Sequence, residues 1–176
     1  AASDVYKRQR LYPDIRSQAL MLYPWSFAFK KTSIAQLVTT PTNEYRYEYQ
    51  LPGDRLGSPR AVYDSNSVGI PPRKEYRIMG SKLLTDYEEV YIDYQYAVPE
   101  YDMPSYFVQL LKYMMTWHLA LPITDQTEKS QYWQSVAIGS PSENGRGGYL
   151  RQAMNIDGAG SPTNAINDFS LIAVRY

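Results

Sequence analysis

The chain has 176 residues, in which 18 lysines and arginines balance 18 aspartates and glutamates. A net charge of zero provides no global field of the kind that attracts nucleic acid or an anionic membrane surface. The sequence contains no cysteine, which excludes a disulfide framework and thiolate chemistry. Its length suffices for one domain with its own core, or for one domain with an arm, and its longest apolar run is shorter than a membrane span.

Tyrosine is the unusual feature of the composition, with 18 residues against 4 phenylalanines and 3 tryptophans. Because tyrosine combines apolar area with a hydroxyl that can stay hydrated, it suits surfaces that alternate between solvent and interface. The 12 prolines and 10 glycines predict that turns and extended segments make up much of the chain.

The N-terminal residues differ in character from the rest. Residues 4–9 (DVYKRQ) correspond to one reading frame of a transposon-end adapter used in sequencing libraries. We therefore expect residues 1–9 to be a sequence artefact and the natural protein to begin earlier; the alternative is an ordinary polar N-terminus. The first helix is predicted over residues 10–23, where apolar residues recur on one face at Leu11, Ile15, Ala19 and Leu22.

A β insertion is predicted over residues 25–98. An extended segment is expected to start in it at Trp25, and shorter strands at 60–63, 75–79, 82–84 and 90–98. Its clearest strand is 44–50, where tyrosines alternate with charged and polar residues at Tyr45, Tyr47 and Tyr49. Such a row could stack nucleobases, but the scarcity of interleaved cations favours a packed sheet face. We expect a small antiparallel meander.

The dominant element is a strongly apolar helix predicted over residues 104–121. Pro104 suits the start of a helix, Asp102 offers a capping oxygen, and Pro122 is expected to end the helix near Leu121. The polar stripe is narrow, being limited to Ser105, Gln109, Lys112 and Thr116. A helix that is apolar nearly all round is expected to be buried on most sides, by its own chain or by another copy.

Two further helices are predicted at 127–138 and 149–157, separated by a glycine-rich loop at 139–148. An extended arm, 161–176, follows and ends in the apolar residues Phe169, Leu171, Ile172, Val174 and Tyr176. An apolar segment after a Gly/Pro break is expected to dock on its own body or on a neighbour. The sequence thus predicts an α+β fold: one domain over 10–160, a helical bundle with the β insertion, plus a C-terminal docking arm.

Candidate catalytic residues are sparse in the sequence. His118 is the only histidine and lies among apolar residues, so a satisfied structural histidine is favoured over a metal ligand or a nucleophile's base. The loop at 142–148 lacks the Gly-Lys-Ser/Thr ending of a phosphate-binding loop. Acidic residues gather near the last strand, at Glu88, Glu89, Asp93, Glu100 and Asp102. Two of them at a suitable separation could hydrolyse glycosides, but strand solvation and helix capping are favoured. We expect no enzyme, no cofactor and no metal.

Several short motifs follow one another along the chain in an order that resembles a known family. They are Tyr12–Arg16 (YPDIR), Leu22–Ala28 (LYPWSFA), Tyr45–Asp54 (YRYEYQLPGD), Leu83–Asp86 (LLTD), Met103–Phe107 (MPSYF), Leu119–Pro122 (LALP), Leu150–Asp157 (LRQAMNID) and Leu171–Arg175 (LIAVR). This ordered set resembles the tail tubular protein A family, the head-to-tail adaptor of short-tailed bacteriophages, over residues 11–176. The sequence departs from that family in two ways. The family's helix before Tyr12 is expected to be missing, and the loop at 139–148 interrupts what is often a longer helix.

The resemblance implies a structural protein of the virion, assembled in the host cytoplasm. Members of the family form a ring of twelve subunits between the portal protein and a tail nozzle that is tubular protein B-like. In some phages, tail fibres attach to the side of the ring. Double-stranded DNA passes through the ring without being read, and no membrane and no active site are implied. The interface residues we expect are the five apolar residues of the arm together with Tyr106, Tyr113 and Trp117 of the central helix.

Two alternatives remain open from the residues. The first is a tail-associated cell-wall hydrolase that uses an acidic pair within residues 88–102, which would require a cleft where two carboxylates face each other. The second is a monomeric binding module that uses the tyrosine-rich strand, which its mass in solution would reveal.

Overall fold

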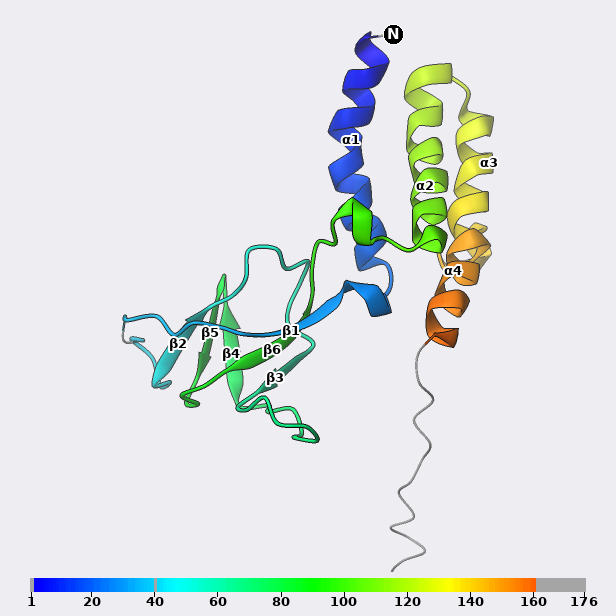
Figure 1. Cartoon of the computed structure of the whole chain (residues 1–176). Coiled ribbons are helices and arrows are strands. Elements are labelled where there is room, and N and C mark those ends of the chain that lie inside the picture. The colour runs from blue at the N-terminus through cyan, green and yellow to red at the C-terminus, as the bar shows by residue number, and fades with distance from the viewer. Residues whose placement is uncertain (1, 40, 161–176) are drawn as a thin grey trace, which may run out of the picture.

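The computed structural model describes residues 2–39 and 41–160. Within them the chain forms a body of four α-helices and a β part inserted between the first two helices (Figure 1). The helical elements are α1 (Ala2–Met21), η1 (Ser26–Ala28), η2 (Glu100–Asp102), α2 (Ser105–Thr124), α3 (Thr127–Ile138), η3 (Pro141–Glu143) and α4 (Gly148–Ala159). The strands are β1 (Phe29–Ser33), β2 (Tyr47–Gln50), β3 (Ala61–Tyr63), β4 (Tyr76–Met79), β5 (Lys82–Thr85) and β6 (Tyr91–Gln95). The predicted α+β class is confirmed.

The helical body is built around α2. Its neighbour on one side is α1 and on the other α3, while α4 packs against α3 and α2 (Figure 1). Phe107, Leu110 and Met114 of α2 are fully buried in this core. Trp25 follows α1 and is also buried, with its indole Nε1 donating to the carbonyl of Ala19 at 3.0 Å. The Phe107 ring lies edge-on to the Trp25 ring, with centroids 5.3 Å apart, and to the Phe27 ring at 5.1 Å. These three aromatic rings close the core at this end of the helical body.

The β part consists of two three-stranded antiparallel sheets, with strand orders β1-β6-β3 and β2-β5-β4. Inward-facing residues of both sheets share one apolar core: Tyr49, Leu51, Val62, Leu83, Val90, Ile92 and Tyr94. The insertion is therefore not a simple meander, because only β4 and β5 are neighbours both in sequence and in a sheet. Two small sheets bury apolar residues against each other, which a single curled layer of short strands cannot do.

The β part is fastened to the helical body by Gln95 at the end of β6. Its side-chain Nε2 donates to the carbonyl of Leu20 in the last turn of α1, at 2.5 Å, and to the carbonyl of Tyr23 just after the helix, at 3.1 Å. The backbone N–H of Tyr96 donates to the carbonyl of Ala28 at 3.0 Å. One amide side chain thus satisfies the end of α1 and joins the two parts.

The ends of α2 differ from prediction. Asp102 was expected to cap the helix, but it lies exposed in η2 and α2 begins after Pro104 with no side-chain cap, so that prediction is wrong. The extended backbone of Met103 and Pro104 separates Asp102 from the first turn. The helix also continues past Pro122 to Thr124, because a proline so near the end removes only one backbone bond. Asp125 N–H still donates to the carbonyl of Leu121 at 3.0 Å.

Two other predicted elements have different limits. The first helix starts at Ala2 rather than residue 10, so the segment before Tyr12 that was expected to lack a helix is helical. Residues 7–10 (KRQR) are good helix formers and contain no breaker. The extended segment expected from Trp25 is η1 instead, and the strand begins only at Phe29. The helix predicted at 127–138 has the limits of α3, and α4 extends the one predicted at 149–157 at both ends.

The predicted alternation of tyrosines and polar residues along the strand at 44–50 is only partly reflected in which side chains are buried. Tyr49 is buried and its hydroxyl donates to the carbonyls of Tyr87, at 2.6 Å, and Glu88, at 2.8 Å, whereas Tyr45 precedes the strand. Glu48, one of the charged residues that alternate with the tyrosines, is also buried. Its carboxylate pairs with Lys82 on β5 and accepts from the Thr39 hydroxyl at 3.2 Å, which removes the need for water. The row is thus largely a packed sheet face.

Candidate interaction surface

An apolar groove of 780 Å³ lies between α1 and α2. Its floor is the α2 face that carries Val108, Leu111, Met115, Leu119 and Ile123, and Tyr12 contributes from α1. The full lining is Arg8, Tyr12, Glu100, Met103, Val108, Leu111, Lys112, Met115, Thr116, Leu119, Ala120, Ile123 and Thr124. An open apolar hollow of this size on a protein surface is typical of a binding site.

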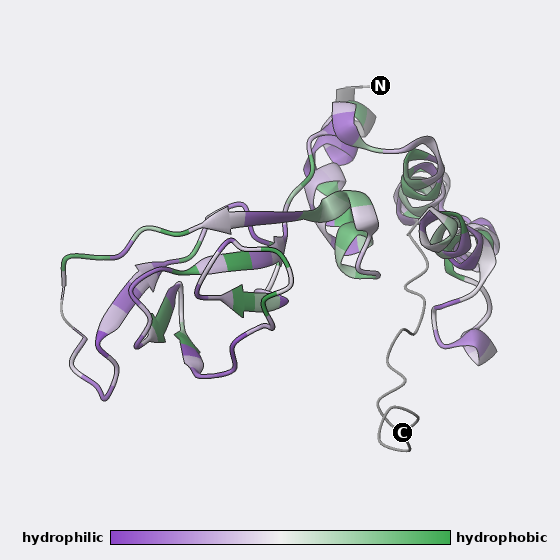
Figure 2. Cartoon of the chain, turned by 60° about the horizontal axis from the view of Figure 1, so that its bottom comes forward, coloured by the Kyte–Doolittle hydropathy of each residue, from purple (hydrophilic) through white to green (hydrophobic). Residues whose placement is uncertain are grey.

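The groove exists because the two halves of α1 differ. In the C-terminal half Ile15, Ala19 and Leu20 are buried in the core. The N-terminal half is rich in long polar side chains, visible as the hydrophilic stretch beside the N-terminus in Figure 2. It reaches α2 through the Nζ of Lys7, which donates to the carbonyl of Pro122 at 3.0 Å. Polar side chains cannot fill an apolar face, so α2 remains partly uncovered there.

The floor of the groove was missed at the sequence level, although a signal for it was present. Val108, Leu111, Met115, Leu119 and Ile123 recur at helical spacing. A second apolar face of the same helix, with Phe107, Leu110 and Met114, forms the intrachain core. A helix with two apolar faces offers no sequence criterion for which face its own chain will cover.

The expected interface residues of α2 lie on the other flank. Tyr113 packs against Trp133 of α3, with ring centroids 6.0 Å apart, and against Tyr149 of α4 at 5.2 Å. The backbone carbonyl of Trp117 accepts from the Ser130 hydroxyl at 3.3 Å. These two residues, with Tyr106, therefore make contacts within the chain. The other expected interface residues, Phe169, Leu171, Ile172, Val174 and Tyr176, lie outside the described residues.

Asp157 joins three elements at the base of the helical body. Its buried carboxylate accepts from the backbone N–H of Ser26 at 2.9 Å, the Ser26 hydroxyl at 2.7 Å and the Tyr106 hydroxyl at 2.6 Å. Burial, reinforced by this carboxylate, raises the pKa of Tyr106 well above its usual range, so the phenol remains a donor. The end of α4 is thereby fixed to η1 and to the first turn of α2.

The acidic residues near the last strand are held by separate partners. Glu88 accepts from the Tyr47 hydroxyl at 3.2 Å, whereas Glu100 accepts from Arg16 and from the Tyr12 hydroxyl. Asp93 lies beside Lys31 and Arg60, and its burial raises its pKa. Glu100 is the one member of this acidic set that lines the groove.

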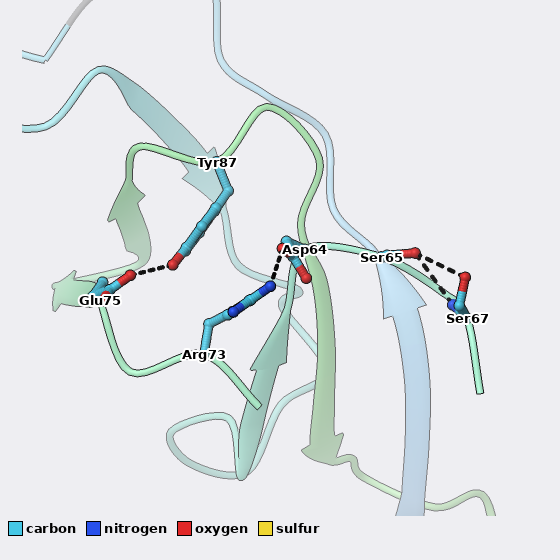
Figure 3. Close-up of polar contacts among 6 residues, drawn as sticks. All are labelled: Asp64, Ser65, Ser67, Arg73, Glu75 and Tyr87. Carbon is cyan, nitrogen blue, oxygen red and sulfur yellow. Dashed lines mark hydrogen bonds and ion pairs between the residues drawn. The ribbon is translucent and has the colours of Figure 1, made fainter. Parts of the chain in front are cut away.

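A polar cluster holds the long loop between β3 and β4 (Figure 3). The Arg73 guanidinium pairs with Asp64 at 2.8 Å, the Tyr87 hydroxyl donates to Glu75, and Ser65 and Ser67 contact each other at 3.2 Å. The backbone N–H of Arg73 donates to the carbonyl of Val62 at 2.7 Å. These contacts hold the loop between β3 and β4 in place.

Across the ranges 2–39 and 41–160, no three or more His, Cys, Asp or Glu side chains are arranged to hold a metal ion. Over the same residues, no helix combines the length and hydropathy that crossing a bilayer requires. A scan against protein-family models gives no match for this chain, and a search of curated proteins gives no significant match.

Asp157→Asn should lower the free energy of unfolding by about 1–3 kcal/mol, because an amide oxygen cannot satisfy three donors as a carboxylate does. Chemical denaturation measures this change. The matched control is Asp102→Asn, whose exposed side chain should be nearly neutral to substitution. Equal effects of the two substitutions would contradict the role assigned to Asp157.

His118→Leu should leave the fold intact, whereas His118→Asp should destabilise it by about 1–3 kcal/mol by placing an unpaired carboxylate in an apolar setting. Burial lowers the pKa of His118 from its ordinary value of 6.5, and its Nε2 has no partner among the described residues. The unfolded chain therefore binds this proton more readily, so the stability from neutral His118 is complete above the ordinary pKa and decreases as the pH falls below it.

Denaturation curves across this pH range measure that effect, and His118→Leu should show a weaker dependence than the natural chain. A His118→Leu protein whose stability depends on pH as strongly as that of the natural chain would contradict this assignment.

Proposed function

We propose that this chain is a structural head-to-tail adaptor of a phage virion, forming a ring between portal and tail nozzle through which DNA passes. The observation that carries the proposal is the open apolar groove between α1 and α2. A subunit of a head-to-tail ring has two unlike mating surfaces, and the groove that residues 2–39 and 41–160 leave open could serve as one of them.

The resemblance to the tail tubular protein A family supports the same assignment. Several of the motifs that carry it occupy structural junctions in this fold. Trp25 and Ser26 lie where the chain leaves α1, and Asp157 contacts Ser26 from α4. Motifs that are distant in sequence therefore meet at the base of the helical body.

The alternatives receive less support from the geometry. A hydrolase requires two facing carboxylates, whereas Glu88 and Glu100 have separate partners on β2 and α1. A binding module based on the tyrosine-rich strand requires an open face, whereas Tyr49 is buried in the core shared by the two sheets. The groove, in contrast, is open and apolar.

The mass of the assembled protein tests the proposal. Native mass spectrometry over increasing concentration should reveal a closed oligomer of defined stoichiometry, twelve subunits if the family pattern holds, and negative-stain images should show rings. A monomer at every concentration would contradict the proposed function and favour the binding module.

A further inference from the structure

We propose that the groove between α1 and α2 of one subunit receives the apolar C-terminal segment, residues 161–176, of a second copy of this chain. The inference rests on the proposed function, and it names the contact that joins neighbouring subunits. The groove and the segment are complementary in chemistry, in reach and in their places on the subunit.

The chemistry of the two surfaces matches. The floor of the groove is formed by aliphatic and thioether side chains such as Val108, Met115 and Leu119. The segment offers large apolar side chains at Phe169, Leu171, Ile172, Val174 and Tyr176. Transferring both surfaces out of water is favourable and does not require a polar match along the floor.

The segment is long enough to reach a neighbour. Residues 160–168 separate the end of α4 from Phe169, and nine residues span at most roughly 30–32 Å when extended. That distance is about the length of a 20-residue helix such as α2. A polar spacer of this length lets the apolar end lie along an adjacent subunit.

The place of attachment favours a second copy over the same chain. The segment follows α4, which packs on α3 and is held by Asp157 to the first turn of α2. The groove lies on the α1 side of α2, opposite the flank covered by α3 (Figure 1). Because the segment and the groove lie on opposite flanks of the subunit, the contact between two copies is heterologous. Such contacts close into a ring when the rotation per subunit permits.

Engineered cysteines provide the test, because the chain contains none of its own. Two single variants, Leu119→Cys in the groove and Leu171→Cys in the segment, are purified as full chains, mixed and oxidised. Docking should join the two variants in a disulfide at least roughly tenfold more often than a control pair, because docking raises the effective concentration of the thiols to the millimolar range. The control replaces Leu119→Cys with Lys129→Cys, an exposed position on α3.

The double variant Leu119→Cys/Leu171→Cys shows whether the docked segment comes from another chain or from the same chain. Disulfides between chains support the proposal, whereas disulfides confined to single chains would show that the segment docks on its own body and would overturn it. If Leu119→Cys fails to fold, Met115→Cys offers a second position on the same floor.

Failure of this inference is distinguishable from failure of the proposed function. Rings without the Leu119–Leu171 cross-link would overturn the docking contact and leave the adaptor in place. Cross-linked chains that never close into rings would support the contact and contradict the adaptor.

Deleting residues 161–176 provides an independent reading. The core formed by residues 2–160 should still unfold cooperatively while assembly is lost. Undiminished assembly of the truncated chain would overturn the inference.

Discussion

The structure depends on one constraint: α2 has more apolar surface than residues 2–39 and 41–160 cover. Phe107, Leu110 and Met114 are buried in the helical core, and α3 covers the flank of Tyr113. The face of Met115 and Leu119 is left, because the N-terminal half of α1 carries polar side chains where an apolar face would be needed. An open apolar groove beside a packed core is typical of an interaction surface, and it is the feature on which the proposed assembly rests.

Buried polar contacts at two junctions hold the elements around this surface in place. Asp157 fastens α4 to η1 and to the start of α2, while Gln95 fastens the β part to the end of α1. Asp157 is buried and accepts three hydrogen bonds, and Gln95 is half-buried and donates two, so both side chains specify one arrangement of the elements. A groove between two helices is useful for assembly only if the helices keep their spacing, and these junctions lie at the end of the body where the spacing is set.

Sequence reasoning was most successful where a pattern was long and strong. The central helix, the limits of α3, the positions of the short strands and the α+β class were all predictable, because apolar periodicity and Gly/Pro breaks determine them locally. The division into two sheets was not, since strand partners depend on contacts distant in sequence. Nor was the role of Asp157, whose donors lie on η1 and α2. The groove escaped because spacing identifies apolar faces but not what will cover them.

The most direct test of the central claim is oxidative footprinting of the methionines before and after assembly. Met115 lies on the floor of the groove, whereas Met79 is exposed on β4 in the β part and serves as an internal reference. If the uncovered face of α2 is a mating surface, Met115 should be oxidised in the monomer and strongly protected in the assembled protein, with a smaller change at Met79. Equal oxidation of Met115 in both states would contradict the account, because the groove would then remain open in the assembly.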